Sequence, residues 1–175
     1  MSASAPLRPP AVTIHPVNES KGGKFAVCDS VLTDAMVRNV ILTWYSSTNE
    51  HRPVADLEIM LAEDVHMSYP DRSESITGRA AFREWYAGVL KVYFDEVHEV
   101  ESWDVKVEEN RAVATVIVRW EARSWLEGVA RSKYEAFISR QCFEIERSAE
   151  DGRAYIRKKN VETFEKTAPL FGIGR

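Results

Sequence analysis

The chain has 175 residues, of which 45% are hydrophobic and 10% aromatic, a length that fits one domain with a single core. Its formal net charge of -4 at pH 7 gives no reason to expect a nucleic acid or an anionic membrane as partner, because phosphate binding needs clustered Lys and Arg. No apolar run approaches the roughly 20 residues of a membrane span. The densest basic run, 157–159, is interpreted as ordinary solvated strand residues that alternate between both faces.

The cysteines Cys28 and Cys142 lie far apart in the sequence and form no metal-type or redox pair. A cytoplasmic, reducing location is therefore expected. Residues 1–27 contain proline breaks in place of a continuous apolar signal segment. We expect them to form a flexible N-terminal arm, followed by one domain over residues 28–166 and a C-terminal tail over residues 167–175.

Three helices are predicted in the first half of the domain. The first begins after Ser30, with Thr33 as another candidate cap, and its apolar stripe is Met36, Val37, Val40, Ile41, Trp44 and Tyr45. A short second helix follows Pro53. After a strand over 65–69 that ends at Pro70, the third helix repeats apolar residues at helical spacing: Phe82, Trp85, Tyr86, Val89 and Leu90.

From about residue 96 to residue 164 the periodicity is two, with turn signals at 109–110, 126–132 and 148–152. Four antiparallel strands are therefore predicted. Helices gathered before a run of long strands indicate an α+β fold, in which three N-terminal helices pack on a strongly curved antiparallel sheet. The resulting cone would enclose a tapering cavity.

Counting back from a two-residue hairpin turn at 109–110 predicts which residues face this cavity. The inner face would carry Val97, Glu99, Glu101, Trp103, Val105 and Val107 opposite Ala122, Trp120, Val118, Val116, Ala114 and Ala112. The third long strand would add Phe137, Ser139, Gln141, Phe143 and Ile145. A buried Gln141 needs partners for its amide. The reverse face mixes apolar and charged residues, which suits solvent or a homodimer interface.

The segment over residues 60–90, MLAEDVHMSYPDRSESITGRAAFREWYAGVL, has an acidic corner, a strand that ends at Tyr-Pro, and Thr-Gly-Arg before an aromatic-rich helix. This pattern resembles the signature of the nuclear transport factor 2-like superfamily, which includes the SnoaL-like polyketide cyclases and the ketosteroid isomerases. The likeness extends from about Thr33 to Phe164 through the order of the elements. Its motifs are degenerate and specify the fold far better than the activity.

The resemblance carries over unevenly to functional residues. In the isomerases the general-base aspartate directly precedes the proline that ends the first strand, and here that position is Tyr69. The oxyanion-hole tyrosine corresponds to Tyr45, and its acidic partner falls near Gln141, whose amide can still donate a hydrogen bond. Glu101, with Glu99 beside it, is the preferred replacement base, because an apolar setting raises the pKa of a carboxyl group. Alternatively, both carboxylates reach solvent at the mouth of the cone.

Further side chains are predicted to line the ligand site. They are Trp44, Met67, Tyr69, Trp85, Tyr86, Glu99, Trp103, Val118, Trp120 and Phe143. Aromatic residues at such spacings also occur as plain core. The 4 histidines are scattered without ligand spacing, and phosphate-binding and dinucleotide motifs are missing, so no metal and no cofactor are expected.

Two functions from different classes remain open. The first is a pocket for an apolar, ring-containing small molecule, with cofactor-free acid–base chemistry of the isomerase, cyclase or dehydratase type. Tyr45 and Gln141 would polarise a carbonyl group and Glu101 would move the proton. The second is a non-catalytic ligand-binding or dimerisation module, in which Tyr69 could fill the cavity.

Overall fold

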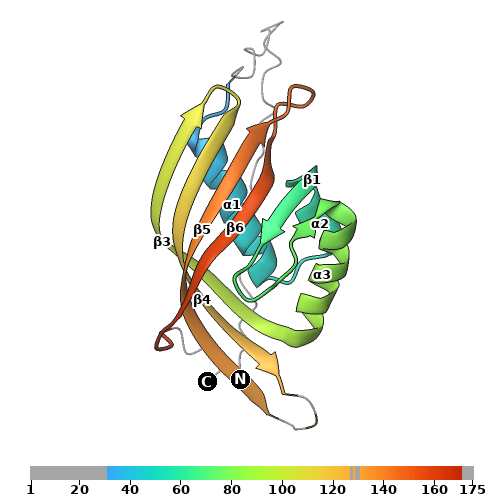
Figure 1. Ribbon diagram of the computed structural model, residues 1–175, viewed down its shortest axis with the longest axis vertical. Coiled ribbons are helices and arrows are strands. Elements are labelled where there is room, and N and C mark those ends of the chain that lie inside the picture. The colour runs from blue at the N-terminus through green and yellow to red at the C-terminus, as the bar shows by residue number, and fades with distance from the viewer. Residues whose placement is uncertain (1–30, 127, 129–130, 171–175) are drawn as a thin grey trace, which may run out of the picture.

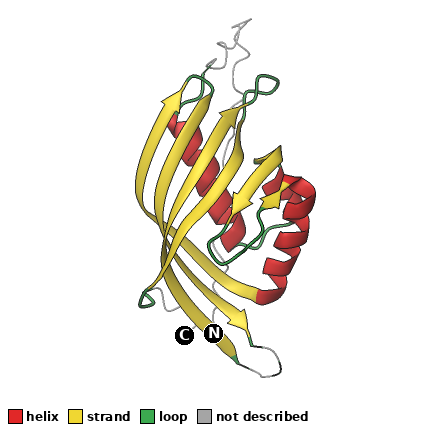
Figure 2. Cartoon of the chain, in the orientation of Figure 1, coloured by secondary structure: helices red, strands yellow, loops and turns green. Residues whose placement is uncertain are grey.

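The computed structural model describes residues 31–126, 128 and 131–170, so the predicted arm over 1–27 and Cys28 lie outside the described residues. Helices and strands are shown in Figure 2, and along the chain they follow the expected order with one addition, the two-residue strand β2. They are α1 (Asp34–Asn49), α2 (Val54–Glu58), β1 (Leu61–Ser68), β2 (Ile76–Thr77), α3 (Gly78–Val92), β3 (Tyr93–Glu108), β4 (Arg111–Trp125), β5 (Ser132–Arg147) and β6 (Ala154–Lys166). Within these residues, no helix is long and apolar enough to cross a membrane.

The strands form one 6-stranded sheet in the order β2-β1-β6-β5-β4-β3. The sheet curves strongly and stays open, and the helices pack on one side of it (Figure 1). This confirms the predicted α+β fold class. The strands β3 to β6 are antiparallel, as predicted, whereas β1 pairs with β6 in parallel. The sheet is therefore mixed and not wholly antiparallel.

Helix α1 packs its apolar stripe against the concave face of the sheet. Thr33 caps the helix, as predicted, because its hydroxyl accepts a hydrogen bond of 3.3 Å from the Met36 backbone N–H. The buried part of the stripe is Val37, Val40, Ile41, Trp44 and Tyr45. These side chains join the inner faces of β1, β4 and β5 in one hydrophobic core.

Helix α1 ends in a Schellman motif whose left-handed residue is a histidine. The backbone N–H groups of His51 and Arg52 each donate a hydrogen bond of 3.0 Å, to the carbonyls of Thr48 and Ser47. His51 has φ 50°, a conformation that glycine usually supplies at this position. The turn therefore retains a side chain at a backbone cost of about 1–2 kcal/mol.

The sheet contains several register shifts, and two of them decide which side chains of the site face the helices. On β3, Val100 pairs with Val118 and Ser102 with Ile117, so Glu101 is an extra residue without a partner on β4. On β6, a register shift falls between Ile156 and Lys158. An extra residue in one strand moves every later side chain to the other face. The predicted pairing is therefore correct from 102 to 108 and wrong before the bulge.

The outer face of the sheet is partly covered by the chain itself. The Thr167 backbone N–H donates to the Ala136 carbonyl at 2.9 Å, and the Leu170 backbone N–H donates to Glu121 Oε1 at 2.6 Å. Glu121 is fully buried although it lies on this outer face. The segment 167–170 thus occupies part of the surface that was expected to contact solvent or a second subunit, and the homodimer stays a prediction.

Candidate functional site

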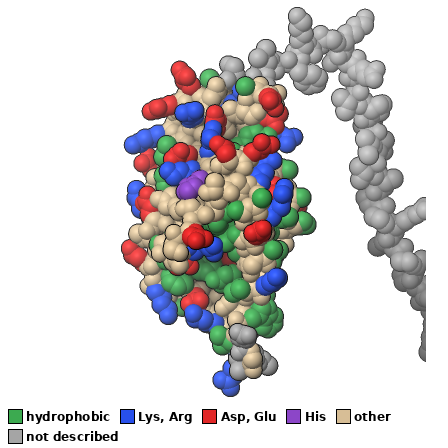
Figure 3. Space-filling view, turned by 45° about the vertical axis from the view of Figure 1, so that its right-hand side comes forward, with side chains coloured by type: hydrophobic (Ala, Val, Ile, Leu, Met, Phe, Trp, Pro, Cys, Tyr) green, Lys and Arg blue, Asp and Glu red, His purple; other side chains and the backbone are tan. Residues whose placement is uncertain are grey.

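A cavity of about 950 Å³ lies between the concave face of the sheet and helices α1 and α3. Its walls carry the aromatic residues Trp44, Tyr69, Trp85, Tyr86, Trp120 and Phe137. Exposed Asp71, Arg72 and Glu74 also border it, which places its opening beside the loop after β1. Hydrophobic side chains gather on the lower part of this face of the molecule (Figure 3). Its size lies within the range of about 300–1,000 Å³ that is usual for small-molecule sites.

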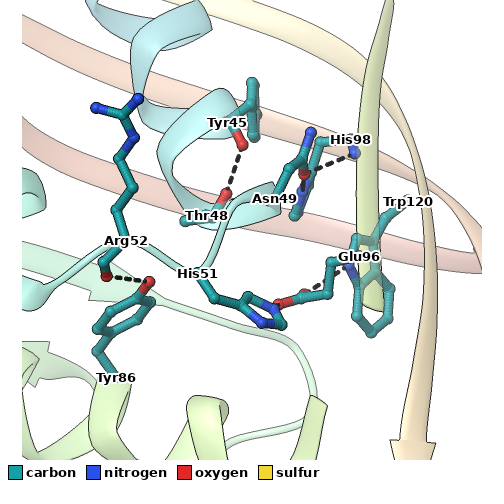
Figure 4. Close-up of polar contacts among 9 residues, drawn as sticks. All are labelled: Tyr45, Thr48, Asn49, His51, Arg52, Tyr86, Glu96, His98 and Trp120. Carbon is teal, nitrogen blue, oxygen red and sulfur yellow. Dashed lines mark hydrogen bonds and ion pairs between the residues drawn. The ribbon is translucent and has the colours of Figure 1, made fainter. Parts of the chain in front are cut away.

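Glu96 is the carboxyl group that the β3 bulge turns into the cavity. Its side chain is only 6% exposed, and Oε2 lies 2.9 Å from His51 Nε2. Oε1 accepts a hydrogen bond of 3.0 Å from Trp120 Nε1–H (Figure 4). Burial raises the pKa of Glu96, and the two hydrogen bonds offset part of this effect. His51 is more exposed, at 21%, so it links the buried carboxyl group to solvent.

His98 lies on the same wall, and its contacts fix its tautomer. The His98 backbone N–H donates to Asn49 Oδ1 at 3.0 Å, which identifies this amide atom as the oxygen. The same oxygen lies 2.7 Å from His98 Nδ1, so Nδ1 carries the ring hydrogen (Figure 4). Burial, with a smaller effect from the Lys159 charge, lowers the pKa of His98 to about 3. The ring is therefore neutral, and Nε2 offers a lone pair.

Tyr45 and Gln141, which were expected to lie close together, are in contact beneath the cavity. The Tyr45 hydroxyl donates to Gln141 Oε1 at 2.9 Å, and Gln141 Nε2 donates to Ser139 Oγ at 2.8 Å. Ser139 in turn donates to the Val118 carbonyl at 3.3 Å. Burial raises the pKa of Tyr45 well above its usual value, so the phenol stays protonated. Gln141 borders the cavity and keeps a second amide hydrogen for which no acceptor is found among the described residues.

Lys159 places a buried amine at the site. The side chain is 5% exposed and borders the cavity, because the β6 bulge turns it inward and leaves Lys158 outside. Its Nζ lies 3.4 Å from the Tyr69 hydroxyl and 4.7 Å from the centre of the Tyr69 ring. Burial lowers the pKa of Lys159 to about 7. The interpretation of 157–159 as solvated residues is wrong at this position.

No protein-family model matches this sequence, and no curated protein matches it. Solved structures do match. A candidate scytalone dehydratase from Novosphingobium aromaticivorans has a TM-score of 0.66 and 16% identity over 81% of this chain and 93% of that chain. A ketosteroid isomerase-like protein from Erwinia carotovora atroseptica has a TM-score of 0.60 and 17% identity over 77% and 96%. The chain has the nuclear transport factor 2-like fold.

The hexachlorocyclohexane dehydrochlorinase LinA-type3 from Novosphingobium barchaimii has the same nuclear transport factor 2-like fold, with a TM-score of 0.63 and 14% identity over 78% of this chain and 90% of that chain. The structural similarity supports the fold that the segment 60–90 predicted. At sequence identities this low, it does not identify an activity. The residues of the site must therefore be judged from their own geometry.

Several predicted site residues line the cavity of this nuclear transport factor 2-like fold, and others do not. The residues at the cavity are Trp44, Tyr69, Trp85, Tyr86, Trp120 and Gln141. Met67, Val118 and Phe143 are fully buried in the core, and Trp103 packs against that core with the Arg38 guanidinium 5.0 Å from its ring centre. Tyr45 reaches the site through Gln141.

The expected inward placement of Glu99 and Glu101 is wrong. Both are exposed, and Glu101 Oε1 accepts a hydrogen bond of 3.1 Å from Arg119 Nε on the surface. The bulge at Glu101 is the physical reason, because it reverses the alternation for residues 95–100 of β3. Even-numbered Glu96 and His98 consequently take the inward positions that had been assigned to odd-numbered residues.

A signal for each bulge was present in the sequence. Val100 and Trp103 both pack against the core, and their spacing of three does not fit a regular strand. Ile156 and Val161 are both buried at a spacing of five, which also needs an extra residue between them. These spacings indicate an extra residue in each strand but do not fix its position, so they do not identify Glu96, His98 or Lys159 by themselves. Among the described residues, no group of three or more His, Cys, Asp or Glu could hold a metal ion.

Proposed function

We propose that the cavity binds an apolar, ring-containing small molecule and catalyses a cofactor-free proton transfer on it, of the isomerase, cyclase or dehydratase type. The observation that carries this proposal is Glu96, a buried carboxyl group that borders an aromatic cavity and has a raised pKa. A proton-transfer group works best when its pKa lies near the working pH. Glu96 thus has the raised carboxyl pKa in an apolar setting that had been expected for Glu101.

The other polar groups of the cavity would orient the ligand. The aromatic rings of Trp85 and Trp120 provide flat apolar walls. Gln141 can donate its remaining amide hydrogen to a ligand oxygen, and His98 Nε2 can accept a hydrogen bond from a ligand hydroxyl group. The arrangement favours a ring compound that carries one hydrogen-bond acceptor and one donor.

His51 would connect the reaction to solvent. Glu96 takes a proton from a ligand carbon and returns it to a different atom, and the hydrogen bond to His51 lets this proton exchange with water. The left-handed backbone conformation of His51 supports this role. Glycine would adopt this conformation with less strain, so the presence of histidine suits a function for its side chain. The names of similar structures, a dehydratase, a dehydrochlorinase and a ketosteroid isomerase-like protein, are in keeping with the proposed class.

A second candidate function is a non-catalytic ligand-binding module. One contact favours it: the Tyr45 hydroxyl is occupied by Gln141 and so does not itself point a hydrogen at a ligand carbonyl. Tyr69 does not fill the cavity, because it lies on the wall and stacks on Trp85 at a centroid distance of 5.2 Å. A cytoplasmic location remains a prediction beside either function.

The test is deuterium incorporation into a panel of cyclic ketones, enones and phenolic ketones in D₂O, measured by mass spectrometry. Proton-transfer catalysis predicts incorporation with the wild-type protein and a loss of about 10²–10⁴-fold with Glu96→Gln. A panel compound that raises the melting temperature without any incorporation would favour the binding module. Glu99→Gln is the matched control, because Glu99 lies on the same strand and is exposed.

A further inference from the structure

Lys159 is a buried nucleophilic side chain that the proton transfer proposed for Glu96 does not require. It lies in the middle of β6, paired with Phe143 of β5 and Met67 of β1, both of which are fully buried. Burying a lysine is costly unless it has a partner or a function. The neighbouring Lys158 shows the ordinary arrangement, since it is 44% exposed and its Nζ lies 3.0 Å from Glu144 Oε1.

The surroundings of Lys159 keep its amine available. Within the described residues, no ion pair is formed by Lys159, and its contacts are the Tyr69 hydroxyl and the rings of Tyr69 and Phe143. A carboxylate within ion-pair distance would hold the amine protonated more strongly than the faces of two aromatic rings do. The titratable groups that share the cavity wall include Glu96 and the neutral His98. Other charged and titratable residues also line the cavity: Asp71, Arg72, Glu74, Glu84, Glu135, Tyr86 and Tyr93.

We propose that Lys159 forms an imine with the carbonyl group of an aldehyde or ketone whose apolar ring occupies the cavity. This inference rests on the cavity being a small-molecule site, and it narrows the ligand to carbonyl compounds. An imine requires an uncharged amine, and burial lowers the pKa of Lys159 to about 7, so a large fraction is uncharged at neutral pH.

The step balances without an oxidant or a metal. The Lys159 nitrogen attacks the carbonyl carbon, a C–N bond forms, and the carbonyl π electrons move to oxygen, which takes up a proton to give a carbinolamine. The nitrogen lone pair then forms the C=N bond while the C–O bond breaks, and the oxygen leaves as water with a second proton. One carbonyl compound and one amine thus give one imine and one water.

Tyr69 is placed to pass the proton. Its hydroxyl accepts the Lys159 hydrogen bond at 3.4 Å, so its own hydrogen is free to point at the carbinolamine oxygen. Burial raises the pKa of Tyr69 above its usual value and keeps this hydroxyl protonated. A protonated imine withdraws electrons more strongly than a ketone, so it would also make the adjacent C–H bond easier for Glu96 to deprotonate.

The test uses the full-length protein, cinnamaldehyde as the probe and sodium cyanoborohydride to reduce any imine. Intact mass should rise by the mass of one aldehyde less one oxygen atom, and peptide mapping should place the adduct on Lys159. At pH 7 about half of the Lys159 amines are neutral, against about one in 3,000 for an ordinary lysine with a pKa of 10.5, so the ratio of Lys159 to Lys158 labelling should exceed about ten.

Equal labelling of the two lysines, or no adduct on Lys159, overturns the proposal and leaves Lys159 as a buried partner of the Tyr69 ring. Lys159→Arg should abolish the adduct while Lys158→Arg keeps it. The wild-type labelling ratio needs no variant, so the test stands even if Lys159→Arg fails to fold. Glu96-dependent deuterium exchange without any trapping at Lys159 would overturn the imine alone. Trapping at Lys159 without such exchange would overturn the proton transfer alone.

Discussion

Glu96 and Trp103 are seven residues apart on β3, and both side chains face the helices. In a regular strand an odd separation places two residues on opposite faces. The bulge at Glu101 removes this conflict by adding one unpaired residue between them. One extra residue therefore decides that Glu96 and His98, and not Glu99, border the cavity.

Replacing His51 separates its backbone cost from the role of its ring. His51→Gly and His51→Ala both lose the contact with Glu96, but only glycine relieves the left-handed backbone at φ 50°. We expect His51→Gly to be more stable than His51→Ala by about 1 kcal/mol in urea denaturation. Both variants should lose deuterium exchange. Equal stability of the two would show that the left-handed turn carries no strain.

The tautomer of His98 can be read directly by nitrogen NMR. The neutral ring should carry its hydrogen on Nδ1 at pH 6.5, and its pKa of about 3 should leave it unprotonated there. Because the folded pKa lies below 6.5, the unfolded chain binds the extra proton, and stability should fall as pH drops from 6.5 toward 3. Asn49→Asp should raise the His98 pKa. Titration of the wild-type ring near 6.5 would contradict the assignment.

Removing the Tyr45 hydroxyl should destabilise the fold. Tyr45→Phe leaves Gln141 Oε1 buried without the donor that now lies 2.9 Å away, which costs about 1–3 kcal/mol. The matched control is Tyr155→Phe, because the Tyr155 hydroxyl hydrogen-bonds to Asp151 at the surface. That change should stay within about 0.5 kcal/mol. Similar free energies of unfolding for both variants would argue against a buried Tyr45–Gln141 hydrogen bond.

Lys159 should make stability depend on pH in the alkaline range. Its pKa is lowered from 10.5 to about 7, so between these values the unfolded chain binds a proton that the folded chain lacks. Stability should therefore rise with pH across this window, by up to about 1.4 kcal/mol per pH unit. Lys159→Met should remove this slope, and Lys158→Met should retain it. A wild-type slope that Lys159→Met leaves unchanged would place the charge of Lys159 in solvent.

The helices and the hairpin could be predicted from local signals. Thr33 caps α1, and the two-residue turn after Glu108 pairs this residue with Arg111, because capping and turn chemistry act over a few neighbouring residues. The inner set of β5, including Ser139 and Gln141, follows from simple alternation in a strand that stays regular over that length.

The functional side chains could not be found by the same counting. Strict alternation does not account for an inserted residue. A missed insertion at Glu101 therefore misplaces residues 95–100 of β3, and one at Arg157 misplaces Lys159. The contact between His51 and Glu96 joins residues 45 positions apart and depends on a left-handed turn at a non-glycine residue. Such a turn has no local sequence signal.

The most direct measurement compares deuterium incorporation by the wild-type protein, Glu96→Gln and Glu101→Gln on the same cyclic ketone. Glu101 is exposed and pairs with Arg119 on the surface, so its variant should exchange at the wild-type rate, while Glu96→Gln should lose about 10²–10⁴-fold. Full exchange by Glu96→Gln together with loss in Glu101→Gln would contradict the placement of the catalytic carboxyl group in the cavity.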